Sequence, residues 1–397
     1  MENILYKAGS NVKKLYIYSI FEMMLFATPI LVPFYISIGL KESDIFLAQA
    51  TFTFAIAAFE VPSGYIADYF GRKKTMVASG LMAAVGIFFY TQAASLTHIL
   101  LAEIVLGIAV SLHSGVKEAI MFDSLLLLRQ EAAFHARGGL LGAFGLFSEG
   151  AANIIGGALA MISLKFPLYG ELMAFLFAAL IATTLHEPER KLLEKGKHMQ
   201  NFKKAFHELW WKNRKIFWLT MVSAVISAST FASLWFSQIF LKRTDLSLVW
   251  FGIWYALGSF AGAYGNYVSH RMRKYVSESG QWALIILLAL IGFIAMYLGE
   301  GLIWVVGFTL APRLAWGLLT PLSNDRMNHG VESDLRVTML SVKSMIANIA
   351  YIIIGPLYGW MIHIYSFQAA LLVAAMILVI CGSVSLLKMN MAKSNSM

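Results

Sequence analysis

The sequence predicts an all-α membrane protein with twelve transmembrane helices, arranged as two six-helix bundles related by a pseudo-two-fold axis. Of the 397 residues, 59% are apolar and 13% are charged, whereas about a quarter of a typical soluble domain is charged. The charged residues cluster between apolar runs of roughly 20 residues, the length that crosses a hydrocarbon core as a helix. The basic residues also gather on one side of these runs.

Twelve apolar runs are long enough to cross a membrane. They cover residues 15–40, 44–69, 75–94, 97–127, 138–161, 165–185, 215–241, 247–269, 280–299, 301–322, 337–362 and 365–387. The longest polar stretch, Glu187 to Lys215, falls midway along the chain. It predicts a first bundle over 1–186, a linker over 187–214 and a second bundle over 215–397.

The distribution of Lys and Arg predicts the orientation. With the N-terminus inside, cytoplasmic segments hold 24 of the 31 basic residues and external loops hold four, Lys41, Lys165, Lys242 and Arg243. The other three lie within spans. Because basic residues favour the cytoplasmic side, and because the number of spans is even, we expect both termini in the cytoplasm. This topology accounts for the net charge of +9 without a nucleic-acid partner.

The start of the chain and its cysteine content favour the bacterial inner membrane. The first 14 residues are polar and basic, and the apolar run after them is too long for a signal peptide. Cys381 is the single cysteine, so no intrachain disulfide forms. No N-x-S/T glycosylation sequence occurs.

Two loops at equivalent places carry a weak internal repeat. GYIADYFGRKK (64–74) follows the second run, and GNYVSHRMRKY (265–275) follows the eighth. A shift of 201 residues brings Gly64 onto Gly265 and Arg72 onto Arg273. Such a duplication in two six-helix units is typical of two-fold transporters.

At these residues the chain resembles the major facilitator superfamily. The loop motif of that family, G-x-x-x-D-[RK]-x-G-R-[RK], matches at Gly64, Asp68, Gly71, Arg72 and Lys73, while Tyr69 stands where a basic residue is usual. The runs EVPSGYIAD (60–68) and LRVTMLS (335–341) are similar to the drug/proton antiporter branch.

Two positions depart from that antiporter branch. Glu103 stands where the branch usually has an arginine early in helix 4. The helix-5 motif lacks its proline and keeps only its glycines, at Gly145, Gly150, Gly156 and Gly157.

The loop motif predicts a cytoplasmic gate. A carboxylate such as Asp68 is stabilised near a helix N-terminus and can also pair with Arg72. Asp123, near the inner end of the fourth span, is a second candidate partner for Arg72. The expected gate residues are Gly64, Asp68, Gly71, Arg72 and Asp123.

Charged side chains inside spans are the candidates for solute and proton binding, because each costs about 2.5–3.5 kcal/mol to insert. The resemblance implies that spans 1, 4, 7 and 10 surround a central cavity. Cations in such a cavity suit a carboxylate- or phosphate-bearing solute. Alternatively, they pair with Glu22 or Glu149, or Lys117 with the adjacent Glu118, and only hold the structure together. The candidate solute-binding residues are Lys117, Arg313, Lys343, Trp235, Gln238, Tyr255, Trp316 and Asn348.

Proton coupling is expected at Glu22 and Glu149, followed by Glu118, since a buried carboxyl group can load and release a proton near neutral pH. The chain has no G-x-x-x-x-G-K-[ST] sequence, so we do not expect ATP to drive it. His113, one turn before Lys117, is expected to be packed or hydrogen-bonded rather than a proton relay.

We therefore predict a monomeric, proton-coupled secondary transporter of a small organic solute, surrounded by lipid, with no cofactor and no metal. The solute is either an organic anion, such as a polycarboxylate or siderophore-like molecule, or an amphipathic drug that is exported. A channel or a sensor on the same fold is a remote alternative. An enzyme is not expected, since the chain has neither HExxH nor GxSxG.

Overall fold

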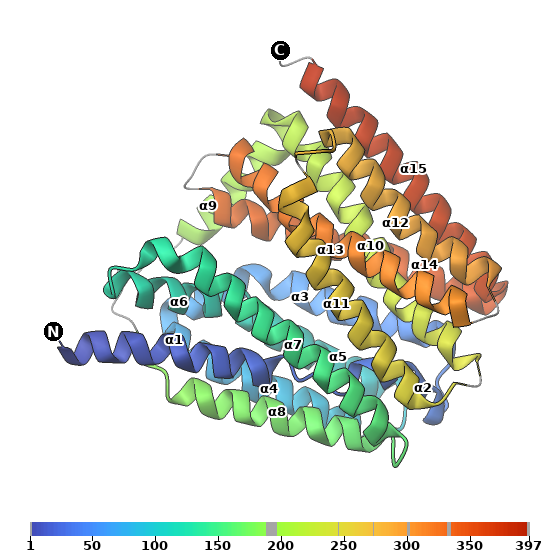
Figure 1. Cartoon of the computed structure of the whole chain (residues 1–397), viewed down its shortest axis with the longest axis horizontal. Helices are drawn as coiled ribbons and strands as arrows, with labels where there is room; N and C mark the ends of the chain where they lie inside the picture. The colour runs from blue at the N-terminus through green and yellow to red at the C-terminus, as the bar shows by residue number, and fades with distance from the viewer. Residues whose placement is uncertain are drawn as a thin grey trace. The chain divides into compact units, whose positions relative to one another are not determined.

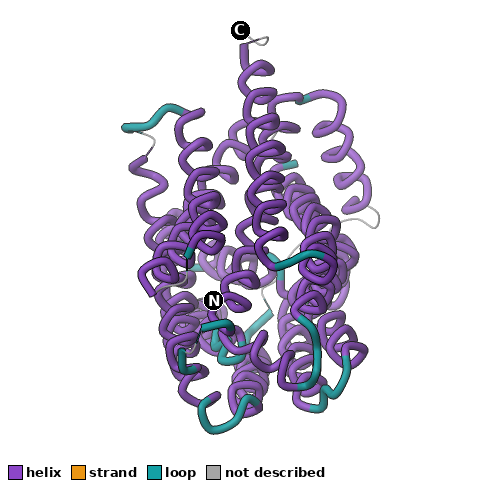
Figure 2. Tube along the Cα trace, turned by 90° about the vertical axis from the view of Figure 1, so that its right-hand side faces the viewer, coloured by secondary structure: helices purple, strands orange, loops and turns teal. Residues whose placement is uncertain are grey.

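The computed structural model describes residues 2–187, 197–244, 246–272, 274–299, 302–331 and 335–394. These residues form helices and short loops without a strand (Figure 2). The elements, labelled in part in Figure 1, are α1 (Glu2–Glu22), η1 (Thr28–Ile30), α2 (Leu31–Ser37), α3 (Glu42–Phe70), α4 (Arg72–Thr91), α5 (Leu96–His113), α6 (Val116–Leu127), η2 (Glu131–Ala133), α7 (Phe134–Ala160), α8 (Lys165–Thr183), α9 (Lys197–His207), η3 (Glu208–Lys212), α10 (Arg214–Lys242), α11 (Leu248–Met272), α12 (Glu278–Leu298), α13 (Leu302–Gly330), α14 (Arg336–Ile364) and α15 (Phe367–Ser394).

Within the described ranges, nine helical segments are long and apolar enough to cross a membrane. They correspond to nine of the twelve expected runs. The other three runs are helical as well. The run 15–40 contains the end of α1 and all of α2, and 247–269 lies in α11 except for its first residue. The run 301–322 lies in α13 except for its first residue, which is outside the described ranges. Residues 188–196 of the expected linker also lie outside them.

Two of the predicted spans contain a break. The first span stops at Glu22 and becomes helical again only at Thr28, just before Pro29, which lacks the N–H that a continuous helix would use. The fourth span stops at His113 and restarts at Val116, because Gly115 has a φ of +72°. Both spans are helical as predicted, and the two breaks are features that the apolar runs did not indicate.

Contacts between Cα atoms divide the chain into two compact units. Unit 1 contains residues 1–34, 58–198 and 247–256, and unit 2 contains residues 35–57, 199–246 and 257–397. Each unit therefore holds most of one sequence half together with one segment of the other: the first part of α3 belongs to unit 2, and the first part of α11 belongs to unit 1.

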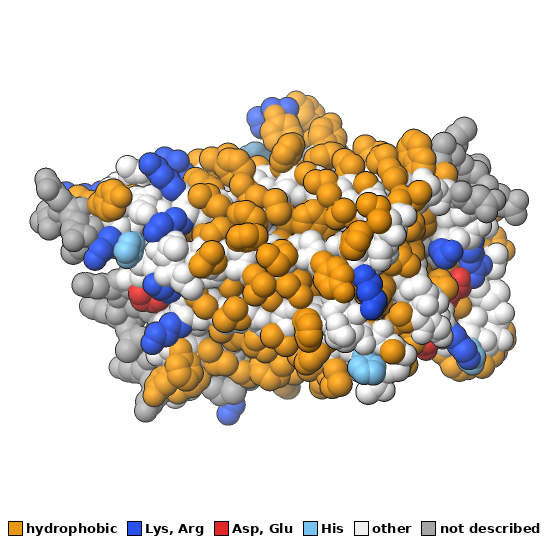
Figure 3. All heavy atoms as spheres, turned by 90° about the horizontal axis from the view of Figure 1, so that it is seen from below, with side chains coloured by type: hydrophobic (Ala, Val, Ile, Leu, Met, Phe, Trp, Pro, Cys, Tyr) orange, Lys and Arg blue, Asp and Glu red, His pale blue; other side chains and the backbone are white. Residues whose placement is uncertain are grey.

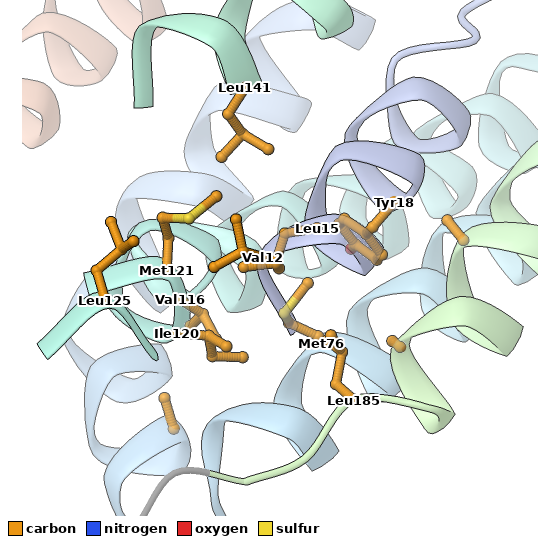
Figure 4. Close-up of a cluster of buried hydrophobic side chains, with 13 residues drawn as sticks. Val12, Leu15, Tyr18, Met76, Val116, Ile120, Met121, Leu125, Leu141 and Leu185 are labelled. Atoms are coloured by element: carbon orange, nitrogen blue, oxygen red, sulfur yellow. The ribbon is translucent and has the colours of Figure 1, made fainter. Parts of the chain in front are cut away.

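The core of unit 1 is a cluster of buried apolar side chains from α1, α3, α4, α6, α7 and α8, together with Leu185 just after α8 (Figure 4). Leu15 and Ile120 are fully buried in this cluster, and Tyr18 is 1% exposed. Helices in a bilayer associate mainly through such close packing. The cluster fixes α1 against α6, which carry Glu22 and Lys117, two of the charged groups described below.

The core of unit 2 is built around the aromatic ring of Phe236 on α10. Its centroid lies 4.8 Å from Phe46, 5.5 Å from Tyr358, 5.9 Å from Phe293 and 5.8 Å from Phe367. Ring pairs at these separations stabilise a core beyond the area that they bury. Helix α10 is therefore the central helix of unit 2.

The surface agrees with a protein that lies in a bilayer. On the face seen in Figure 3, hydrophobic side chains cover the middle, and most Lys and Arg side chains lie toward the two ends. Exposed large apolar residues such as Phe54, Phe147 and Ile353 are 58%, 70% and 67% exposed. Contiguous apolar surface on this scale is typical of contact with lipid rather than with water.

Candidate functional site

The two broken spans bring three ionisable side chains together in unit 1. The Glu22 carboxylate, at the end of α1, lies 2.6 Å through Oε1 from His113 Nε2 and 2.8 Å through Oε2 from Lys117 Nζ. His113 is the last residue of α5, and Lys117 lies in the first turn of α6. The three side chains are only 11–17% exposed. We call Glu22, His113 and Lys117 the Glu22 cluster.

Both nitrogens of the His113 ring are engaged. Nε2 faces Glu22, and Nδ1 lies 3.2 Å from the Tyr18 hydroxyl. The rings of Tyr18 and His113 also stack, with centroids 5.6 Å apart. The hydroxyl is able to donate to a neutral imidazole or to accept from a protonated one, so the geometry accommodates both protonation states of His113.

The helix ends influence the charges of the Glu22 cluster. The C-terminus of an α-helix favours a cation, and its N-terminus disfavours one. Lys117 at the start of α6 therefore depends on Glu22 for compensation. The cluster has no net charge when His113 is neutral and one positive charge when it is protonated.

The remaining carboxylates predicted for proton coupling lie outside these contacts. Lys117 pairs with Glu22 and not with the adjacent Glu118, whose side chain is exposed. Glu149 on α7 is 9% exposed and follows Ser148, whose hydroxyl donates to the Ile20 carbonyl at 2.7 Å. The interpretation of His113 as a packed or hydrogen-bonded residue missed its ion contact with Glu22; its position one turn before Lys117 was the available signal.

The loop motif forms a second charged arrangement in unit 1. The Arg72 guanidinium pairs with Asp123 of α6, the partner that the sequence suggests. Gly71 has a φ of +102°, a region that L-residues rarely adopt. Gly64 and Asp68 lie on the last two turns of α3, where Asp68 is half-buried.

Glu187, which follows α8, is a functional candidate that the sequence does not reveal. Its carboxylate accepts hydrogen bonds from the backbone N–H groups of Arg72 (2.8 Å) and Lys73 (2.7 Å), at the N-terminus of α4. The motif suggested a carboxylate at a helix N-terminus, and the structure shows one at α4. The residue that supplies this carboxylate is Glu187 rather than Asp68.

Basic residues also surround His186, the neighbour of Glu187. Its backbone N–H donates to Asn11 Oδ1 at 2.9 Å, and its carbonyl accepts from the Asn11 amide. Partial burial, and then the charges of Lys14, Lys7 and Lys73, lower the pKa of His186 from its ordinary value. His186 therefore adds no positive charge at neutral pH to this already basic end of unit 1.

Unit 2 contains a half-buried cation with neutral partners. The Lys343 ammonium on α14 donates to Ser323 Oγ at 2.8 Å and to Asn324 Oδ1, both on α13. No carboxylate among the described residues lies within ion-pair distance of it. Because Ser and Asn carry no charge, this positive charge is available to attract an anion.

The other solute-binding candidates occupy different environments. Trp235 and Gln238 on α10 are 4% and 0% exposed, and Tyr255 on α11 is 2% exposed. Arg313 and Asn348 are half-buried on α13 and α14, and Trp316 is 40% exposed. Lys343 and Asn348 share α14 and lie five residues apart. The roles of all these residues stay predictions.

Two cavities at the ends of unit 2 differ from this site. One of about 220 Å³ is lined by Lys215, Glu278, Asp325, Arg326 and His329, among others, so acidic and basic groups balance there. Another of about 510 Å³ is lined partly by Arg243, which already binds Glu42 at 2.6 Å. Neither cavity presents an uncompensated charge of one sign. Within the described ranges, no group of three or more His, Cys, Asp or Glu side chains is placed to hold a metal ion.

An all-helical membrane protein with broken spans and charged groups at the breaks has the architecture of a membrane carrier. The model of the Major Facilitator Superfamily matches residues 15–342 of the chain, and the chain belongs to this family. A search of curated proteins finds no match.

Solved structures share the fold. A mutant form of the nucleoside transporter NupG has a TM-score of 0.82 at 14% identity, covering 95% of this chain and 99% of that one. A bacterial homologue of the human lysosomal transporter Spinster gives 0.77 at 15% identity over 97% of both chains. A POT family transporter in complex with 5-aminolevulinic acid gives 0.77 at 12% identity over 96% of both. These likenesses, together with the family match, identify a transporter fold and not an enzyme.

Proposed function

We propose that this protein is a proton-coupled secondary transporter that moves a small organic anion across the bacterial inner membrane by alternating access. The observation that carries the proposal is the Glu22 cluster. A half-buried carboxylate shared by an ammonium and an imidazole, at the break of two spans, is a site whose charge changes when one proton binds. Glu149 and Glu118 stay candidates for further proton steps.

The proposed mechanism couples protonation to contact between helices. When His113 is protonated, it competes with Lys117 for the Glu22 carboxylate and strengthens the link between α1 and the end of α5. When it is neutral, Lys117 is the main charged partner and Glu22 is drawn toward α6. A proton therefore changes the relative stability of two arrangements of the broken spans, which is what a coupling site must do.

An anionic solute is favoured by the charge of Lys343. Its ammonium has only neutral partners among the described side chains, so a carboxylate or phosphate would complete its coordination. We include Lys117, Arg313, Trp235, Gln238, Tyr255, Trp316 and Asn348 as further proposed solute contacts. The names of the similar structures mention nucleosides and 5-aminolevulinic acid, so the fold alone does not select the solute.

The remaining assignments complete the proposal. Gly64, Asp68, Gly71, Arg72 and Asp123 form a cytoplasmic gate, to which we add Glu187. The two bundles comprise residues 1–186 and 215–397, joined by a cytoplasmic linker, and both termini are cytoplasmic. The protein works as a monomer.

The test is solute uptake in proteoliposomes, with citrate as a polycarboxylate probe and an inward proton gradient. The proposal predicts saturable uptake that collapses when the gradient is removed and that is lost in Lys343→Gln, while Lys388→Gln, an exposed lysine near the C-terminus, transports normally. Equal citrate uptake by Lys343→Gln and wild type would contradict the anion site. A linear, non-saturating flux would instead indicate a channel.

Export of amphipathic drugs is the second candidate. The runs EVPSGYIAD and LRVTMLS favour it, because they are similar to the drug/proton antiporter branch. Ethidium efflux from the same proteoliposomes distinguishes the two functions: proton-driven ethidium transport together with no response to citrate would support export and overturn the anion proposal.

A further inference from the structure

The segment before α10 combines aromatic and basic side chains on an exposed surface. Residues 200–215 contain five basic residues and one acidic residue, and they form the second part of α9, η3 and the start of α10. Lys203, Lys204 and Lys212 are exposed, and Trp210 and Trp211 are 40% and 64% exposed. We call these five residues the linker platform.

The segment has a distinct inner face. Ala205 and Leu209 are fully buried, so the platform is held in place rather than extended into solvent. The Trp210 ring stacks on Phe206 with centroids 5.3 Å apart and meets Phe217 of α10 edge-on at 5.0 Å. These contacts connect the platform directly to the first turn of α10.

The outer face carries side chains that rarely stay exposed to water alone. Trp211 stacks on His207 with centroids 5.5 Å apart, and the ring remains the most exposed tryptophan of the segment. Tryptophan concentrates at membrane–water interfaces, where its ring contacts acyl chains and its N–H contacts headgroups. Two adjacent exposed tryptophans among lysines are therefore the kind of side chains that lie at a membrane–water interface.

The charge of the platform selects the type of lipid. Lys212 forms an i,i+4 pair with Glu208 at 3.4 Å, which leaves it 64% exposed, and no ion pair of Lys203 or Lys204 is found among the described side chains. Lysines beside a membrane surface are attracted to anionic headgroups, and their attraction to zwitterionic headgroups is much weaker. The segment also precedes α10 on the side that the basic residues predict to be cytoplasmic.

We propose that the linker platform is a binding surface for anionic phospholipid headgroups of the cytoplasmic leaflet. The three lysines bind the phosphate-bearing headgroups, and Trp210 and Trp211 insert between them and the acyl chains. Through Phe217 the bound lipid fixes the first turn of α10, the central helix of unit 2. This surface is independent of the proposed solute and proton sites.

The experiment measures tryptophan quenching of the purified full chain in detergent by brominated phosphatidylglycerol or brominated phosphatidylcholine. The part of the total quenching that comes from Trp210 and Trp211 is the difference between wild type and the Trp210→Phe/Trp211→Phe variant. We expect wild type to bind brominated phosphatidylglycerol more tightly than phosphatidylcholine at this site. Lys203→Gln/Lys204→Gln/Lys212→Gln should weaken the binding by about tenfold or more, since each lysine near an anionic surface contributes severalfold.

The matched control replaces three exposed lysines elsewhere, Lys7→Gln/Lys13→Gln/Lys388→Gln, and should leave the platform quenching unchanged. Equal quenching by the two lipids, equal loss in the control, or no loss in the platform variant would each overturn the proposal. Full reversal of the platform quenching by excess inorganic phosphate would also overturn the proposal, because it would show that the site binds a free anion rather than a lipid headgroup. A thermal-unfolding scan of each variant shows whether a change in quenching comes from misfolding.

Discussion

Removal of the Glu22 carboxylate should destabilise the protein more than removal of Lys117, although the two residues form one ion pair. Glu22→Gln leaves the Lys117 ammonium, 11% exposed, without its carboxylate, and an uncompensated buried charge costs about 3–5 kcal/mol. Lys117→Met leaves Glu22 with His113 as a second partner at 2.6 Å. The loss of stability in Lys117→Met should then be about 1–3 kcal/mol, as for a lost hydrogen bond to a charged group.

The double variant Glu22→Gln/Lys117→Met completes the cycle. Because it removes both charges, its loss of stability should be smaller than the sum of the two single losses by about 1–3 kcal/mol. The assay is the free energy of unfolding from an SDS titration in mixed micelles, followed by circular dichroism.

Additive losses would refute this reasoning. If the two single losses sum to the double loss within about 0.5 kcal/mol, Glu22 and Lys117 do not form a coupled buried pair. Equal losses for Glu22→Gln and Lys117→Met would show that His113 provides no second partner for the carboxylate. Glu131→Gln, which changes an exposed carboxylate in η2, controls for the removal of a negative charge and should be nearly neutral.

Substitutions at three further positions test other parts of the structure by the same unfolding titration. Gly115→Ala should cost about 1–2 kcal/mol, because its φ of +72° is unfavourable for a residue with a Cβ; no loss would indicate that the fourth span is continuous. The Ala27 N–H donates to Glu171 Oε2 at 2.8 Å. Glu171→Leu should cost about 1–3 kcal/mol, since it leaves this N–H without an acceptor. Glu171→Gln keeps an acceptor and should cost less. Arg243→Gln should cost at most about 1 kcal/mol, because its pair with Glu42 is 42% and 23% exposed; a much larger loss would mean that this pair is shielded from water.

The helical architecture follows from sequence because hydrophobic length is a local property. Each expected run coincides with one helix or with a broken pair, and the family motif at Gly71 and Arg72 marks the turn between α3 and α4. The sequence also suggested Asp123 as a partner for Arg72, on the basis of its place near the inner end of the fourth span.

The breaks and the long-range contacts depend on information that composition does not carry. The turn at Gly115 falls in a polar stretch of the run 97–127, with His113 and Lys117 on either side, but polar residues inside a span do not by themselves specify a break in the helix. Lys117 is adjacent to Glu118, yet it pairs with Glu22, because helical neighbours point in different directions and the packing of α1 on α6 decides which side chains meet. Glu187 is separated by 115 residues from the N–H that it caps, a contact that only the folded chain defines.

The central claim is that the Glu22 cluster couples proton movement to solute movement. Its most direct test compares two transport modes of Glu22→Gln and wild type in proteoliposomes with citrate: accumulation driven by a proton gradient, and exchange of labelled for unlabelled citrate without a gradient. We predict that the variant loses accumulation and keeps exchange. Accumulation at the wild-type rate, in a variant that has no carboxylate to share between His113 and Lys117, would contradict the claim.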